Sequence, residues 1–157
     1  MQAFFEFQSL ISELSGLDVA NASLYEGGSG VAEAVLMAGR CTGRTGRVVI
    51  AGSTNPEYVQ TLKSYFANKS TEVVVVPTPQ GAINLDELAA VVTDQTACVL
   101  VHHPNFFGCL EEVAAIGEIA HRSGALLVQS FDPLSIGLLK RPGDLGTDIA
   151  VAEGQSL

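Results

Sequence analysis

The strongest constraint on the fold of this chain is the alternation of unbroken aliphatic runs with segments of helical periodicity. Within its 157 residues, such runs lie at 19–24, 47–51, 72–76, 96–101, 125–128 and 148–152. Runs that are apolar at nearly every position suit strands buried on both faces, as in parallel sheets. We therefore predict strands at these ranges and an α/β fold, with helices on both faces of a mostly parallel, doubly wound sheet.

Helical patterns fill the segments between these runs. Phe4, Phe7, Ile11 and Leu14 lie at the spacing of one helix face, and Gly16 predicts the end of that helix. Further helices are expected after Glu26, from Asn55-Pro56, from Asn84 and over 111–123. No linker or internal repeat interrupts the pattern, so residues 1–157 read as a single domain.

Composition excludes several classes of function. The chain is 47% hydrophobic and carries a net charge of −9, which argues against nucleic acid and anionic membrane partners. No apolar run approaches the length of a membrane span. Cys41, Cys98 and Cys109 have neither disulfide nor zinc spacing, so we expect a cytoplasmic protein without a metal site.

Gly27, Gly28, Ser29 and Gly30 form a glycine-rich turn at the expected start of a helix. Glycines let the backbone approach a ligand closely, and a helix N-terminus offers free N–H groups to a phosphate. The turn matches neither a P-loop nor a dinucleotide fingerprint. The adjacent anion Glu26 also counts against phosphate, so a purely structural turn is an equal alternative.

A second polar cluster, which contains His102, His103, Pro104 and Asn105, follows the run at 96–101. Ligands in open α/β sheets bind at the carboxyl ends of strands, and alternation should turn one histidine toward that edge. That histidine has two interpretations, a site residue or a hydrogen-bonded structural one. Asn105 either builds the Pro-Asn turn or contacts a cofactor. Glu111 and Glu112 are interpreted as solvated residues of a first helical turn, and no catalytic triad can be assembled.

Taken in order, several motifs resemble the P-protein family of the glycine cleavage system, in particular subunit 1 of glycine dehydrogenase (decarboxylating). The motifs are Phe5–Gln8, Leu17–Ser23, Tyr25–Ala34, Pro104–Gly108, Asp132–Leu139 and Asp148–Gln155. The resemblance covers essentially the whole chain. It implies an aspartate-aminotransferase-like large domain of fold type I. Because there is no capped start, and the chain stops just after an apolar run, we expect a truncated domain.

The resemblance also implies an activity shared between subunits. A homologous subunit 2 would carry pyridoxal phosphate, and the complex would decarboxylate glycine and pass the aminomethyl group to the lipoyl H-protein. Such an oxidoreductase of glycine catabolism needs a Schiff-base lysine. Lys63, Lys69 and Lys140 are all expected on the surface. Ser156 falls about where the lysine of catalytic relatives would stand, and Gln129 where their ring-nitrogen carboxylate would.

We therefore expect no catalytic residue in this chain, which alone should be inactive. Vestigial or site-completing contacts to the cofactor are assigned to Gly27, Gly28, Ser29, His103, Asn105 and Gln129. The family fold further predicts that one more strand, absent here, would pair between 19–24 and 148–152. The alternative function is a stand-alone nucleotide- or phosphate-binding domain that uses the Gly27–Gly30 turn.

Overall fold

The fold is built on a five-stranded sheet in which every neighbouring pair of strands is parallel. The computed structural model describes residues 1–157. Its strands are β1 (Arg47–Ala51), β2 (Glu72–Val76), β3 (Thr96–His103), β4 (Leu126–Phe131) and β5 (Ile149–Ala152). They are ordered β2-β1-β3-β4-β5, so β3 is central and the carboxyl ends of all strands meet at one edge. The predicted α/β class is confirmed.

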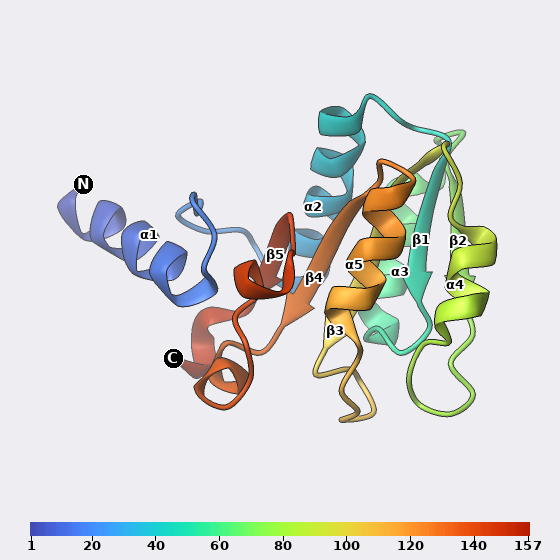
Figure 1. The fold of residues 1–157 in the computed structure, drawn as a ribbon. Coiled ribbons are helices and arrows are strands. Elements are labelled where there is room, and N and C mark those ends of the chain that lie inside the picture. Colours follow the sequence, from blue (N-terminus) through green and yellow to red (C-terminus); the bar gives the residue numbers. More distant parts are fainter.

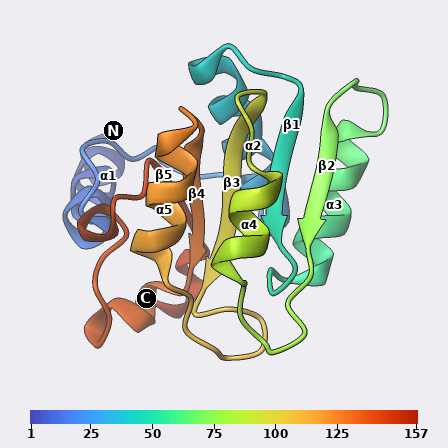
Figure 2. The same ribbon diagram turned by 45° about the vertical axis from the view of Figure 1, so that its right-hand side comes forward.

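Helices cover both faces of the sheet. The α2 (Gly27–Thr42) and α3 (Pro56–Phe66) helices pack on one face, and α4 (Leu85–Val91) and α5 (Val113–Arg122) on the other, as Figure 2 shows. The Asn55 side chain caps α3 by accepting from the Glu57 N–H at 2.9 Å, and Asn84 caps α4 in the same way. Both helices begin where the sequence predicted, each with an asparagine at the N-cap.

Strict alternation along β3 divides its side chains between the two layers. Leu100 packs with the α2 and α3 layer, whereas Val101 packs with the α4 and α5 layer, and both are fully buried. His102 and His103 continue this alternation at the carboxyl end of the strand. His102 therefore faces the α3 side and His103 the α5 side.

The predicted strand at 19–24 is wrong. These residues form no strand, and Val19 is 84% exposed. The segment instead connects α1 (Gln2–Ser15) to α2, where Gln8 Nε2 donates to the Ala20 carbonyl at 2.6 Å. Aliphatic content alone misled the prediction, because it does not report whether a segment pairs with a neighbouring strand, and residues 19–24 pair with none of the five strands.

Helix α1 is confirmed, but it extends away from the body of the molecule (Figure 1). Its apolar side chains are largely in solvent, with Phe4 61%, Phe5 73% and Leu10 67% exposed. Single exposed apolar residues are ordinary, whereas a contiguous set marks a surface that another element covers. Arg141, which donates to the Glu13 carbonyl at 3.1 Å, joins the base of α1 to the body.

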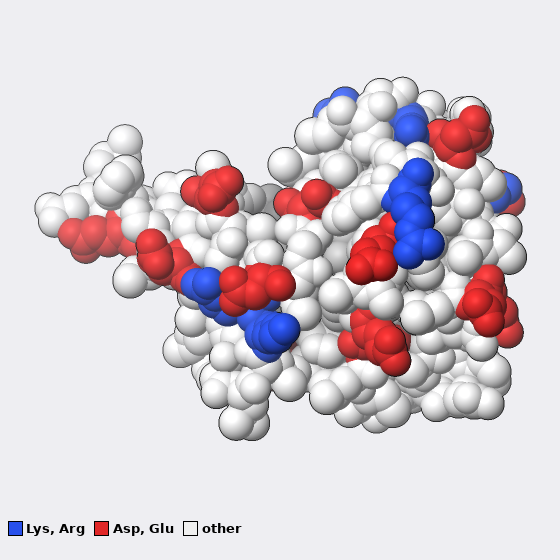
Figure 3. Space-filling view, in the orientation of Figure 1, with Lys and Arg blue, Asp and Glu red and all other residues white.

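Acidic side chains predominate on the surface. Figure 3 shows them spread over the visible face, with only a few basic side chains among them, and no broad basic patch. The predominance of acidic side chains on this face agrees with the net charge of −9. None of the helices combines the length and the apolar character that crossing a bilayer requires.

A buried carboxylate joins the loops at the carboxyl edge of the sheet on the α5 side. Glu111 Oε1 accepts from Ser53 Oγ at 2.6 Å and from Asn105 Nδ2 at 2.7 Å, and Oε2 accepts from the Ile83 N–H at 3.0 Å. The Glu111 N–H donates to His103 Nδ1 at 3.1 Å. Glu111 is only 5% exposed, so its interpretation as a solvated residue was wrong.

Replacing this carboxylate tests its structural role. Because Glu111→Ala leaves two buried donors, on Ser53 and Asn105, and the partly buried Ile83 N–H without this acceptor, we expect a loss of about 2–4 kcal/mol in the free energy of unfolding. Urea denaturation followed by circular dichroism measures it. Glu112→Ala is the matched control, since that neighbouring side chain is exposed and caps nothing. Equal effects of the two substitutions would contradict the assignment.

Candidate functional site

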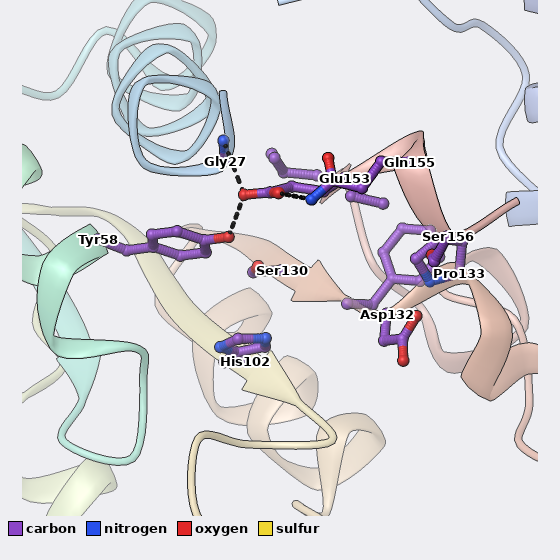
Figure 4. Close-up of a pocket in the computed structure, with 12 residues that line it drawn as sticks. Gly27, Tyr58, His102, Ser130, Asp132, Pro133, Glu153, Gln155 and Ser156 are labelled. Carbon is purple, nitrogen blue, oxygen red and sulfur yellow. Dashed lines mark hydrogen bonds between the residues drawn. The ribbon is translucent and has the colours of Figure 1, made fainter. Parts of the chain in front are cut away.

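A cleft of about 240 Å³ opens at the carboxyl ends of β3, β4 and β5, on the side of α2 and α3. Figure 4 shows its side chains converging from these elements. Twelve residues line the cleft: Gly27, Tyr58, His102, Ser130, Phe131, Asp132, Pro133, Val151, Ala152, Glu153, Gln155 and Ser156. This edge of a parallel sheet is the usual place for a ligand, so the cleft is the candidate site.

The glycine-rich turn forms the start of α2 above the cleft. Glu26 is the N-cap residue, and its carboxylate accepts from the Gly28 N–H at 2.6 Å and from the Ser29 N–H. The Ser29 hydroxyl completes a capping box with the Glu26 backbone. These hydrogen bonds hold the pKa of Glu26 below its ordinary value. The capping interpretation of the turn therefore has direct structural support.

Glu153 links the end of β5 to α2 and α3. Its Oε1 accepts from the Gly27 N–H at 3.1 Å and from the Tyr58 hydroxyl at 2.7 Å. Its Oε2 accepts from Gln155 Nε2 at 2.7 Å. A Cβ atom on Gly27 would clash with both the Tyr58 hydroxyl and the Glu153 carboxylate. Glycine at position 27 is therefore required for this contact.

Electrostatics in the cleft follow from these bonds. Hydrogen bonds, first from Tyr58 and then from Gln155, hold the pKa of Glu153 below its usual range. Burial, together with the bond to Glu153, raises the pKa of Tyr58. At neutral pH the pair is therefore a carboxylate that accepts from a neutral phenol.

His102 lies beneath this pair on the floor of the cleft. Its ring stacks on Tyr58, with 5.9 Å between ring centroids and an interplanar angle of 16°. Its Nδ1 atom is buried and has no hydrogen-bond partner. Burial, reinforced by the neighbouring His103, lowers the pKa of His102. The cleft thus contains a neutral imidazole with an unused nitrogen.

Of the six residues that the sequence suggested for cofactor contacts, only Gly27 lines the cleft. The N–H groups of Gly28 and Ser29 are bonded to Glu26. His103 and Asn105 contact Glu111 on the opposite face of the sheet. Gln129 is also buried away from the cleft, where its Oε1 accepts from the Thr147 hydroxyl at 2.6 Å.

Sequence reasoning did not identify Tyr58 and Glu153 as site residues. They are 95 positions apart in the chain, and Gly27 and Glu153 are 126 apart, so no local motif joins them. Strand β4 also runs to Phe131 rather than ending at Gln129, which places Ser130 at the cleft instead. Alternation counted along the longer strand would have indicated Ser130.

The cleft lacks an amine. Lys63, Lys69 and Lys140 are all exposed, and none lines it. Ser156 does line the cleft, at the position where the sequence suggested that catalytic relatives carry a lysine. Asp132, on the rim, accepts from the Leu134 N–H at 3.0 Å and so caps the turn that begins at Pro133. The arrangement can accept hydrogen bonds from a ligand but offers no side chain that condenses with an aldehyde.

The two histidines predict a pH dependence of stability. Burial lowers the folded-state pKa of both His102 and His103, whereas in the unfolded chain histidine titrates near 6.5. Below that pH the unfolded chain binds more protons, so the free energy of unfolding should fall as pH drops from about 7.5 to 5.5. Urea denaturation across this window checks it. His102→Phe, which keeps an aromatic ring against Tyr58, should make the dependence shallower, and an unchanged slope would contradict this account.

Comparison with known proteins agrees with the motifs. The family model for the glycine cleavage system P-protein matches residues 1–157. The probable glycine dehydrogenase (decarboxylating) subunit 1 of Geotalea daltonii is 48% identical over 157 residues, which are 100% of this chain and 35% of the relative. The protein of the same name from Chlorobium phaeobacteroides is 51% identical over 158 residues, again 100% of this chain and 35% of the relative. This chain spans about a third of the length of these curated relatives.

Solved structures show the same likeness. The crystal structure of an inhibitor-bound glycine decarboxylase (P-protein) of the glycine cleavage system superposes with a TM-score of 0.92 at 44% identity. The match covers 99% of this chain and 34% of that one. MetB from Corynebacterium glutamicum shares the fold, with a TM-score of 0.72 at 18% identity over 95% of this chain and 37% of its own. Because the family model matches every residue and these relatives agree with it, this chain belongs to the glycine cleavage system P-protein family.

Proposed function

We propose that this chain is part of a P-protein subunit 1 and that it acts together with a homologous subunit 2. The assembly would decarboxylate glycine oxidatively and pass the aminomethyl group to the lipoyl arm of the H-protein. The names of the relatives support this proposal, since they are called subunit 1 of a decarboxylating glycine dehydrogenase. The proposal that subunit 2 supplies the catalytic lysine is supported by one observation: the cleft at the carboxyl edge of the sheet contains no lysine.

Pyridoxal phosphate, the cofactor of the P-protein family, does not fit the cleft of this chain as a covalently bound group. Such attachment needs an amine within reach of the aldehyde, and every lysine here lies on the exposed surface. The N–H groups at the start of α2 are also bonded to the carboxylates of Glu26 and Glu153. We therefore assign the cofactor and its lysine to the partner subunit.

The contribution of this chain would be to support and complete a site built mainly by the partner. Among its polar side chains, His102, Asp132 and Gln155 line the cleft at the sheet edge. We propose these residues for contacts across the assembly, in place of His103, Asn105 and Gln129, which are buried in the chain's own core.

Exposed apolar side chains support the proposal that the chain works inside a larger assembly. Besides α1, the loop after β3 exposes Phe106 (53%), Phe107 (59%) and Leu110 (57%). Apolar surface of this kind is covered in proteins that associate, because burial removes it from water. Two such regions on one chain are consistent with contacts to the other parts of a P-protein.

Chemical trapping tests where the cofactor binds. The chain is mixed with a P-protein subunit 2 and an amount of pyridoxal phosphate equal to the subunit 2 sites. The mixture is then reduced with borohydride and analysed by mass spectrometry. Because no lysine of this chain reaches its cleft, we expect the reduced adduct on subunit 2, and only a trace on the chain alone. A stoichiometric adduct on Lys63, Lys69 or Lys140 would overturn the proposal.

A further inference from the structure

We propose that this chain excludes phosphate-bearing ligands from its own cleft by placing two of its own carboxylates, those of Glu26 and Glu153, on the first N–H groups of α2. The inference concerns only residues of this chain. It rests on the proposed function and extends it, from the absence of a lysine in the cleft to the absence of a place for the phosphate group of a ligand. It explains why a glycine-rich turn at the carboxyl edge of a sheet, where such turns commonly bind phosphate, would bind none here.

The first step is the hydrogen-bond inventory of the helix start. The first N–H groups of an α-helix have no partner within the helix, and an anion bound there uses them. Here the Gly27 N–H donates to Glu153, and the Gly28 and Ser29 N–H groups donate to Glu26. All three donors that point toward a would-be ligand are therefore satisfied inside the chain.

The second step is the way Glu153 is held. The Tyr58 hydroxyl and the Gln155 amide each donate to it at 2.7 Å, so its two oxygens are fixed from two elements besides α2. Figure 4 shows the carboxylate between Tyr58 and the backbone nitrogen of Gly27. A carboxylate fixed by three donors, one of them a backbone N–H, does not swing away without leaving those donors unpaired.

The third step is the requirement for glycine. A side chain on Gly27 would collide with the Tyr58 hydroxyl and the Glu153 carboxylate, whereas a side chain on Gly28 would meet Glu26 and Thr61. The absence of a side chain on these glycines therefore lets Glu153, Glu26 and their neighbouring side chains lie close to the backbone of α2. A ligand is not needed to explain the glycine-rich sequence of the turn.

The fourth step is charge. A phosphate group that entered the cleft would meet Glu153 and, on the rim, Asp132, with the charge of Glu26 close to Glu153 and no lysine or arginine among the lining residues. Like charges repel most strongly where water is partly excluded. Both the occupied donors and the local negative charge therefore act against the same class of ligand.

Binding of pyridoxine 5′-phosphate and of inorganic phosphate, measured by isothermal titration calorimetry, tests the inference. Neither probe has an aldehyde, so surface lysines do not interfere. We expect no saturable binding by the unchanged chain up to about 1 mM, the weak end of specific affinities. The double variant Glu26→Ser/Glu153→Ser keeps a serine cap on α2 but frees its N–H groups, so it should bind both probes at least roughly tenfold more tightly.

Three controls make the result specific. Glu57→Gln removes a neighbouring exposed carboxylate that does not touch α2, so it should gain no affinity. Pyridoxine without its phosphate should bind the double variant no better than the unchanged chain. The single variant Glu153→Ser retains the Glu26 cap and should show a smaller gain, which keeps the test decisive if the double variant does not fold.

Two results would overturn the inference. One is saturable phosphate binding by the unchanged chain with an affinity equal to that of the variants. The other is a folded double or single variant, judged by circular dichroism, that gains no affinity for either probe. Both results are independent of borohydride trapping, which reports only on the lysine, so a failure here is distinguishable from a failure of the proposed function.

Discussion

The candidate site depends on one carboxylate that connects three elements far apart in the sequence. Glu153, just after β5, accepts from the start of α2 and from Tyr58 on α3. Because β5 lies at the edge of the sheet, these bonds hold its end against the helical layer and give the cleft one of its walls. The stacked Tyr58 and His102 rings then define the floor.

A glycine-rich turn before a helix is commonly associated with phosphate binding, and this chain shows when that association fails. The turn supplies N–H groups and close approach, but the neighbouring residues decide which anion satisfies them. Here the anions belong to the chain itself, and Glu26 at the N-cap was the signal visible in the sequence.

Local patterns predicted most of the fold. Aliphatic runs and asparagines at helix starts are effective signals because they depend mainly on interactions between residues close in the sequence. The run at 19–24 failed because a strand needs an edge to pair with, which composition does not report. Glu111 looked solvated because its four partners, three in loops and one at the end of β3, come together only at the folded sheet edge. Local patterns did not indicate the contacts of Glu153 for the same reason, since its partners Gly27 and Tyr58 lie far away in the sequence.

The two histidines show how much one residue of strand register matters. Both His102 and His103 belong to β3, and only the alternation of side chains sends the first to the cleft and the second to Glu111. A strand that ended two residues earlier, as the sequence suggested, leaves this choice open. Register at the end of a central strand is set by pairing with its neighbours, here β4, through His103 opposite Phe131.

The central claim is that the chain's own acids occupy the N-terminus of α2. A crystal structure of the chain grown in the presence of phosphate tests it most directly. The account predicts Glu153 Oε1 within hydrogen-bond distance of the Gly27 nitrogen, the Glu26 carboxylate on Gly28 and Ser29, and no phosphate between them. A phosphate bound to those three N–H groups, with Glu153 turned away from Tyr58, would contradict it.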